Sequence, residues 1–312
     1  MQSDVLVIVL PVFLVIGLGF GLKRTGLVGP DFLFQLNRLI YYIALPALLF
    51  YKISTADFSA SFNGALLFGL LATTLIIFLL SLGYASLRPW SPAMRGAFCQ
   101  GSFRGNLAYV GLAIVYNAYG ETGFTVAGIL LGFMVPLFNF LSVLALSLPH
   151  RESRRGPGGV DLLKQVCGNP LIIASFVGIS WSYLELPLPQ VVDRALNIIT
   201  GMSLPLALIS IGASFSFKKL RGDLGVACLV TCIKIVLMPL LATGLLLLLG
   251  IRGDELGIGI LLAGTPTATA AYIMAQQMRC DAELSGAIIM LSTLCSLFAY
   301  TAGLFLLRFS GG

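Results

Sequence analysis

The chain consists of long apolar stretches separated by short polar turns. A membrane-spanning helix needs about 20 mainly apolar residues, so a chain of 312 residues with short loops holds about ten of them. The pattern predicts spans at residues 5–22, 32–53, 63–87, 96–119, 123–148, 166–183, 190–217, 224–250, 257–278 and 284–307. We therefore predict an all-α integral membrane protein with ten transmembrane helices.

Two of these spans contain residues that do not suit a continuous membrane helix. In span four, residues 102–106 (SFRGN) place Arg104 and Asn106 next to glycine, and in span nine residues 264–269 (GTPTAT) place Pro266 among threonines. Unpaired backbone groups cost several kcal/mol in lipid, so a broken helix persists only where protein or a water-filled cavity surrounds it. Matching interruptions in two halves of a chain indicate a transporter's binding site.

The interruptions belong to a wider repetition between the halves. A Leu-Pro pair recurs at Pro46 in span two and at Pro205 in span seven. We therefore predict a first five-helix repeat at residues 1–148, a linker at 149–161 and a second five-helix repeat at 162–312. An odd number of spans per repeat gives the two halves opposite orientations, as in many secondary transporters.

Basic residues favour one orientation in the membrane. Turns after odd-numbered spans hold Lys23, Arg24, Arg88, Arg95, Arg151, Arg154, Arg155, Lys164, Lys218, Lys219, Arg221 and Arg279. The other turns and the C-terminus hold Lys52, Arg194, Arg252 and Arg308. Because positively charged loops stay in the cytoplasm, we expect a multi-pass protein of the cell membrane with the 149–161 loop in the cytoplasm and both termini extracellular or periplasmic.

Composition excludes several classes of protein. Hydrophobic residues make up 58% of the chain and charged residues 10%, against about a quarter charged in soluble domains. The net charge of +6 comes from turns between spans, so it does not indicate a nucleic-acid partner. Six cysteines without a CxxC pair, and a single histidine, predict no metal site and no cofactor. Cys228 and Cys232 lie four residues apart and could share an ion, but small core residues are the favoured interpretation.

Several stretches resemble the auxin efflux carrier family, bacterial type, within the bile acid/arsenite/riboflavin transporter superfamily. They are residues 37–50 (NRLIYYIALPALLF), 104–106 (RGN), 169–170 (NP), 204–214 (LPLALISIGAS), 265–266 (TP) and 271–272 (AY). The resemblance covers essentially the whole chain and rests on the order and spacing of these motifs.

The resemblance implies a fold like that of the sodium/proton antiporters and bile acid symporters. Spans one, two, six and seven would form a scaffold, and spans three to five and eight to ten a mobile core in which broken helices 4 and 9 cross. Asn106 and Pro266 match the family's crossover asparagine and proline. Family substrates are auxin, an indole carboxylate, and organic anions such as malate and malonate, and a homodimer is compatible with the same resemblance.

The residues at the interruptions suggest how a small organic anion would bind. Helix N-termini attract anions, Arg104 adds a charged donor fork, and Asn106 can donate and accept hydrogen bonds. Alternatively, Arg104 caps carbonyls freed by the broken helix. Thr265, Thr267 and Thr269 could contact substrate with their hydroxyls, but satisfying loosened backbone is the commoner role. Pro46 is a further candidate contact, although shaping its own helix is favoured.

Asn139 and Lys234 are the remaining candidates. Asn139, in span five, either faces the same cavity or holds two helices together. All thirteen Asp and Glu residues fall in turns or at span ends, so a sodium site or proton relay built on a buried acid is not expected. Lys234, near the middle of span eight, is therefore our candidate for a proton site or charge-compensating site that couples transport. Snorkelling or a structural contact is the alternative.

Three functions fit a membrane protein of this kind. The first is a secondary transporter for a small organic anion, working by elevator-type alternating access. The second is a membrane ligand sensor or receptor that binds such an anion without transporting it. The third, a membrane-embedded enzyme, is disfavoured because the spans offer almost no acid–base or metal-binding groups. No nucleotide-binding motif is present in the sequence, so direct ATP drive is not predicted.

Overall fold

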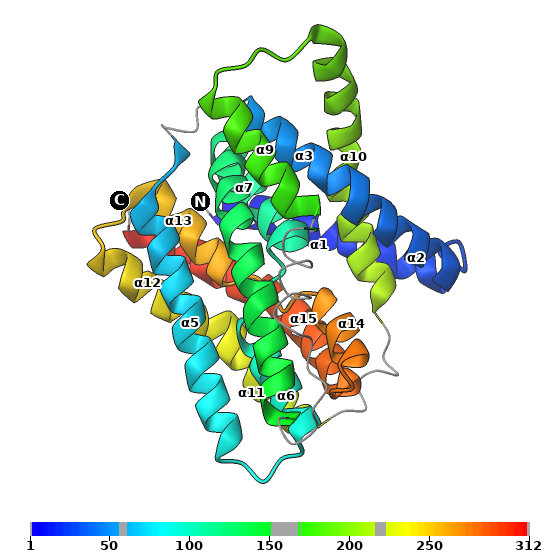
Figure 1. Cartoon of the computed structure of the whole chain (residues 1–312), viewed down its shortest axis with the longest axis vertical. Helices are drawn as coiled ribbons and strands as arrows, with labels where there is room; N and C mark the ends of the chain where they lie inside the picture. The colour runs from blue at the N-terminus through cyan, green and yellow to red at the C-terminus, as the bar shows by residue number, and fades with distance from the viewer. Residues whose placement is uncertain (1, 56–60, 151–167, 169, 216–222, 311–312) are drawn as a thin grey trace. The chain divides into compact units, whose positions relative to one another are not determined.

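The computed structural model covers residues 1–312 and is all-helical (Figure 1). It describes the chain except residues 1, 56–60, 151–167, 169, 216–222 and 311–312. Most of the predicted 149–161 linker therefore lies outside the described residues. The elements are α1 (Gln2–Arg24), α2 (Pro30–Leu39), η1 (Ile40–Ala44), α3 (Leu45–Ser54), α5 (Gly64–Ser86), α6 (Pro92–Phe103), η2 (Leu107–Gly111), α7 (Leu112–Ser147), η3 (Leu148–His150), α9 (Pro170–Tyr183), α10 (Gln190–Ser214), α11 (Leu224–Cys232), η5 (Ile233–Leu237), α12 (Met238–Leu248), α13 (Gly253–Ala263), α14 (Ala270–Gln277) and α15 (Ala282–Ser310).

Seven helical runs in the described part of the chain are long and apolar enough to cross a membrane. They are Val5–Arg24, Pro30–Ser54, Gly64–Ser86, Leu107–Ser147, Gln190–Ser214, Leu224–Leu248 and Ala282–Leu307. The run Leu107–Ser147 contains 41 residues, and two helices meet within it at Gly120, whose φ of 62° and ψ of −152° are not helical. The protein is therefore an all-α, multi-pass integral membrane protein.

Prolines inside two of these runs are accommodated by a wider helical turn. In a regular helix the proline ring clashes with the carbonyl of the residue four positions earlier. Pro46 is preceded by the π-helix η1, in which Leu45 N–H donates to the Ile40 carbonyl five residues back. Pro239 is preceded in the same way by η5, where Met238 N–H donates to Ile233. The helices continue through both prolines, and the wider turns alter the direction of the side chains around them.

The helices divide into two compact units. The first comprises Met1–Asn63, Ala108–Val135 and Cys167–Phe215, and the second Gly64–Leu107, Pro136–Val166 and Ser216–Gly312. Within the first unit α1 packs along α10. A β-carbon on Gly19 would overlap the backbone of Ile209, and one on Gly212 would overlap that of Ile16. These glycines allow the close helix packing by which small residues stabilise membrane helix pairs.

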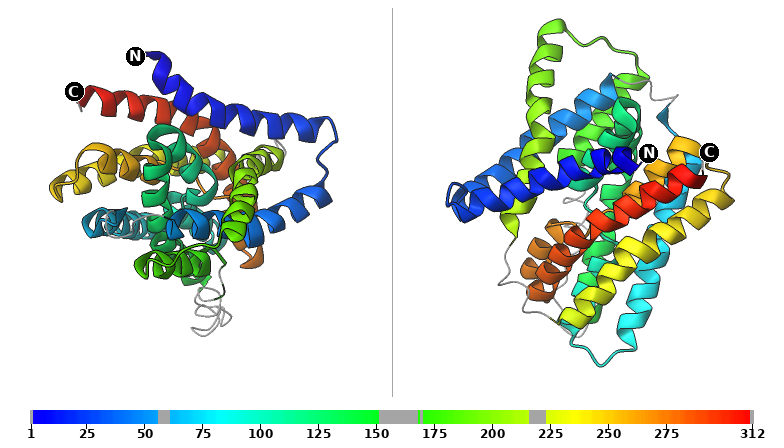
Figure 2. Two further views of the ribbon diagram at one scale, coloured as in Figure 1. Left: turned by 90° about the horizontal axis from the view of Figure 1, so that it is seen from above. Right: turned by 180° about the vertical axis from the view of Figure 1, so that it is seen from behind.

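The second unit contains the α5, α6 and α11–α15 helices. Here α11 runs along α15, and α12 packs against α5 and α13 (Figure 2). Phe98 of α6 belongs to a buried core that also contains Ala227 and Val230 of α11 and Ile288 of α15. All residues from Gly96 to Phe103 are buried. The end of α6, where the first predicted interruption lies, is therefore held by packing on several sides.

Candidate functional site

Both predicted interruptions are present, and both lie in the second unit. The α6 helix begins at Pro92 and ends at Phe103. Ser91 caps its N-terminus, and the Ser91 Oγ accepts a hydrogen bond from Met94 N–H. Arg104 then leaves the helical conformation with a ψ of 94°. The α13 helix ends at Ala263, and α14 begins only at Ala270. Each interruption is thus a true break, after which a new helix begins.

The two broken segments satisfy each other's backbone. Gly105 and Thr267 form an antiparallel bridge. Asn106 N–H donates to the Pro266 carbonyl at 2.8 Å, and Ala268 N–H donates to the Arg104 carbonyl at 3.0 Å. Each break removes intrahelical hydrogen bonds, and water is not present in the membrane to replace them. The bonds between the two segments replace them instead. They explain how two unwound segments persist inside a membrane protein.

Gly105 makes the close approach possible. A β-carbon at this position would overlap Thr265 Oγ1 and lie 3.5 Å from Lys234 Cε and Nζ. The segment therefore has room for a backbone but not for a side chain.

The Arg104 side chain bonds to α7. Its Nη1 donates to the Phe138 carbonyl at 3.1 Å and to Ser142 Oγ at 2.7 Å, and its Nη2 donates to Asn139 Oδ1 at 2.8 Å. The residue is buried. Of the two roles left open by the sequence, these bonds favour a structural one, in which Arg104 ties the first break to α7. They also favour the interhelical role for Asn139.

Two of the three threonines bond to nearby backbone or side chains. Thr265 Oγ1 donates to the Leu262 carbonyl at 2.8 Å, and Thr267 Oγ1 donates to the Gly101 carbonyl at 2.9 Å. Thr267 N–H also donates to Ser292 Oγ at 3.0 Å. Both hydroxyls therefore satisfy backbone carbonyls near the helix ends. Thr269 precedes α14 and makes no side-chain cap bond there.

Asn106 differs from its neighbours. It is 6% exposed, yet no hydrogen bond among the described residues involves its side-chain amide. Asn is a favoured residue just before a helix because its side chain can accept from the first free N–H groups. Asn106 directly precedes η2 without making such a bond. A buried amide that is not used by the fold is available for a ligand.

The breaks also create a favourable field for an anion. A helix N-terminus carries about half a positive charge and N–H groups without intrahelical partners. One such end follows Asn106, where η2 leads into α7, and another follows Thr269 at the start of α14. Within the described residues, no hydrogen bond uses the N–H groups of Thr269 or Ala270.

Other candidate residues lie elsewhere or act through different atoms. Pro266 contributes its carbonyl, which accepts from Asn106. Pro46 belongs to the first unit, in the first turn of α3. Cys228 and Cys232 are exposed, so the interpretation of these cysteines as core residues was wrong. Among the described residues, no group of three His, Cys, Asp or Glu side chains could hold a metal ion.

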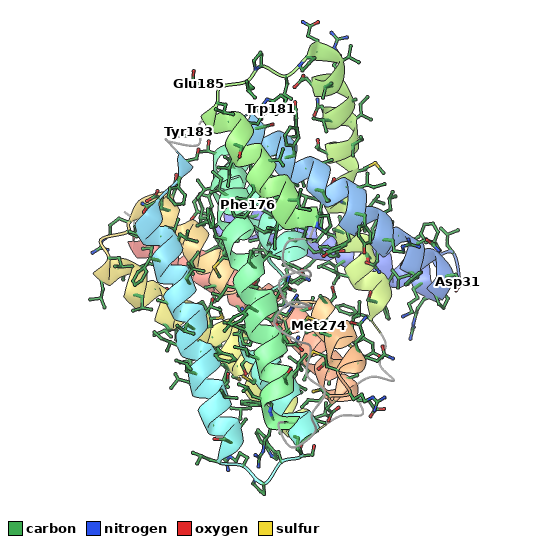
Figure 3. The ribbon with its side chains drawn as sticks, in the orientation of Figure 1. Asp31, Phe176, Trp181, Tyr183, Glu185 and Met274 are labelled. Atoms are coloured by element: carbon green, nitrogen blue, oxygen red, sulfur yellow. The ribbon has the colours of Figure 1, made fainter. Side chains whose placement is uncertain are left out.

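Sequence reasoning did not identify several polar residues that support the breaks. Ser142 and Ser292 bond to Arg104 and to Thr267. Gln100, on α6, is fully buried with its Oε1 unbonded, and its Nε2 lies 3.6 Å from Sδ of Met274. Met274 lies on α14 and is labelled in Figure 3. Ser142 could have been found from its spacing, because it shares a helix face with Asn139. Gln100 and Ser292 gave no comparable signal.

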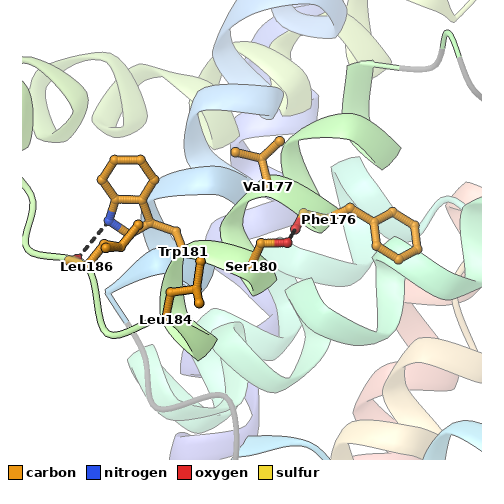
Figure 4. A pocket seen from close by; sticks show the side chains of 6 residues that line it. All are labelled: Phe176, Val177, Ser180, Trp181, Leu184 and Leu186. Atoms are coloured by element: carbon orange, nitrogen blue, oxygen red, sulfur yellow. Dashed lines mark hydrogen bonds between the residues drawn. The ribbon is translucent and has the colours of Figure 1, made fainter.

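A surface groove in the first unit has a different character. It is lined by Phe176, Val177, Ser180, Trp181, Leu184 and Leu186 (Figure 4). Trp181 Nε1 donates to the Leu186 carbonyl at 2.8 Å, so the one indole donor is already used. The lining contains no cation and no amide side chain, and therefore does not suit an anionic ligand.

Comparison with known proteins decides the class. A family model described as "Membrane transport protein" matches residues 4–302. The chain belongs to this family, that of the auxin efflux carriers. This membrane transporter is therefore not an enzyme.

The transporter has relatives in archaea, bacteria and plants. It is 26% identical over 300 residues to an "Uncharacterized transporter" of Methanothermobacter thermautotrophicus, covering 93% of this chain and 94% of the relative. It is 26% identical over 313 residues to a "Putative malonate transporter" of Rhizobium meliloti, covering 98% and 97%. Auxin efflux carrier component 6 of Arabidopsis thaliana is 25% identical over 140 residues, which cover 43% of this chain and 25% of the plant protein.

Proposed function

We propose that this transporter is a secondary carrier for a small organic anion, such as a carboxylate, that binds at the two breaks beside Asn106. The observation that carries the proposal is the Asn106 side chain, a buried amide at a helix break that makes no hydrogen bond within the described part of the chain. Its NH₂ group can donate to a carboxylate oxygen. Thr269 and the N–H groups at the start of α14 are the other contacts we propose.

Electrostatics supports an anion as the substrate. Each break is followed by the N-terminal end of a helix, which attracts negative charge. Arg104 keeps its positive charge close to the first break although its guanidinium bonds to α7. The name of the Rhizobium meliloti relative, "Putative malonate transporter", agrees with this substrate class.

The same proposal includes a full topology. We propose ten spans in two inverted five-helix repeats, with helices 4 and 9 crossing at the breaks. Helices 1, 2, 6 and 7 would form a scaffold, and helices 3–5 and 8–10 a core that moves to expose the anion alternately on each side. The repeated Leu-Pro pairs and repeated breaks support this arrangement.

Uptake of radiolabelled malonate and related dicarboxylates into proteoliposomes tests the function. We expect the wild-type protein to transport at least one of them. Replacing Asn106 by Ala should lower uptake at least tenfold without changing the unfolding temperature, because the amide has no structural bond to lose. Asn197→Ala, on the exposed surface of α10, is the matched control and should transport normally.

Two results would count against the proposal. Wild-type uptake by Asn106→Ala would remove this amide from the binding site. Saturable binding of a dicarboxylate to purified protein, without flux in proteoliposomes, would favour the sensor or receptor function instead.

A further inference from the structure

Among the described residues of the second unit, Lys234 is the most deeply buried cation. It lies in η5, within the π-helical turn before Pro239, and is fully buried. Its Nζ donates to the Ala263 carbonyl at 2.7 Å. The same nitrogen lies 3.5 Å from the position that a β-carbon on Gly105 would occupy. The ammonium therefore lies beside the first break and at the C-terminal end of α13, where the second break begins.

This ammonium has no carboxylate partner in the described structure. Lys52 and Glu121 form an ion pair at 2.6 Å, and none of the described acids pairs with Lys234. A buried charge without compensation is strongly unfavourable, so something else must stabilise it.

Two helix C-termini supply that compensation. The α6 helix ends at Phe103 and α13 ends at Ala263, the residue that accepts the Lys234 hydrogen bond. Each helix C-terminus carries roughly half a negative charge, so the two together amount to about one negative charge. One ammonium therefore balances the two helix ends.

Helix ends of this kind are also where carriers bind cations. Carbonyl oxygens of unwound segments and the C-terminal ends of half-helices coordinate Na⁺ or H⁺ in secondary transporters. Here a carbonyl of that kind is taken by a side chain of the protein itself.

We propose that the Lys234 ammonium is a built-in counter-ion, standing where a carrier of this kind would hold a metal cation, so that anion transport requires no metal cation as co-substrate. The inference rests on the proposed function, because it concerns the charge that accompanies the anion. With Arg104, the core then carries two fixed positive charges, and a bound dianion such as malonate makes it nearly neutral, which lowers the electrostatic cost of moving it through the bilayer.

The first test uses the unmodified protein. Initial rates of labelled dicarboxylate uptake into proteoliposomes are measured in Na⁺, K⁺ and choline media with no ion gradient. We expect rates within twofold of one another. A rate that requires Na⁺ or K⁺ would overturn the inference while leaving the transport function intact.

The second test removes the ammonium. We expect Lys234→Met, which keeps most of the volume, and Lys234→Ala, which leaves a cavity, both to lower uptake at least tenfold. Millimolar methylammonium should restore uptake severalfold in Lys234→Ala and not in Lys234→Met, because only the smaller side chain leaves room for it. Methanol, similar in size but uncharged, is the control additive and should restore nothing.

These outcomes separate the inference from simpler explanations. Wild-type transport by Lys234→Met, or no rescue of a folded Lys234→Ala protein, would overturn it and leave Lys234 a packing residue. If neither variant folds, the cation series on the wild-type protein decides. Absence of wild-type uptake in every medium would instead contradict the proposed function.

Discussion

Arg104 illustrates how the role of a single residue depends on neighbours distant in the sequence. A cation at a helix break can bind an anionic substrate or tie down the broken helix. The guanidinium donates to the Phe138 carbonyl, Ser142 and Asn139, all on one face of α7. Its planar fork suits three acceptors in a row, and this supports the structural role.

Replacing Arg104 by Lys tests that role. An ammonium keeps the charge but cannot span three acceptors, and hydrogen bonds to charged groups contribute roughly 1.5–3 kcal/mol each. We expect the free energy of unfolding in detergent to fall by about 2–3 kcal/mol, while the apparent KM of the remaining transport changes less than twofold.

Ser142→Ala, which removes one acceptor, is the matched control and should cost about 1 kcal/mol. A tenfold rise in KM with unchanged stability in Arg104→Lys would show instead that the guanidinium contacts substrate.

At the scale of elements, the breaks are stable because the backbone of each segment forms hydrogen bonds with the other. The bridge between Gly105 and Thr267, with the two flanking backbone bonds, satisfies groups that α6 and α13 leave free. Neither segment could remain unwound alone, since lipid offers no hydrogen bonds. The pairing is therefore cooperative, and a substitution in one break should disturb both.

Gly105→Ala tests this cooperation. The new methyl group would overlap Thr265 Oγ1, so the two segments must separate. We expect uptake to fall at least tenfold and the unfolding temperature to drop by several degrees. Adding Thr265→Ala, which removes the overlapping oxygen, should recover part of both losses.

Gly303→Ala on α15, where a β-carbon meets no atom within 4 Å, is the control and should change neither quantity. Normal transport by Gly105→Ala would show that the close pairing is not required.

At the scale of the whole molecule, the proposed inverted repeat fixes how many spans separate any two turns. That number decides whether the two turns lie on the same side of the membrane or on opposite sides. Leu87 lies in the turn after α5, and Asp254 lies in the first turn of α13. Both are exposed. The proposed topology places five spans between them, which puts them on opposite sides of the membrane.

Single cysteines at these positions, in a background without the native cysteines, test the count. Because the turn holding Arg88 is rich in positive charge, we expect Leu87→Cys to react with an impermeant maleimide only after cells are permeabilised. Asp254→Cys should react in intact cells. Labelling of both from one side would exclude five spans between them.

The sequence by itself predicted the seven long apolar helical runs of the described residues and the two breaks, whereas the full count of ten spans stays a prediction. Helix 63–87 was expected and α5 is Gly64–Ser86, because a bilayer-length apolar run has few alternatives to a helix. The interruptions were also marked locally, by glycine next to Arg104 and by proline next to Thr265, because both residue types disfavour a continuous helix. Membership of the membrane transport protein family follows from the chain as a whole.

The tertiary structure decided which polar atoms are used by the fold and which are left for a ligand. Sequence could not separate Arg104 from Asn106, since both are polar residues at one break. Only the packing of α7, α13 and α15 around that break shows the guanidinium engaged and the amide unbonded. Hydrogen bonds between segments far apart along the chain depend on three-dimensional placement, and no local pattern of residues records it.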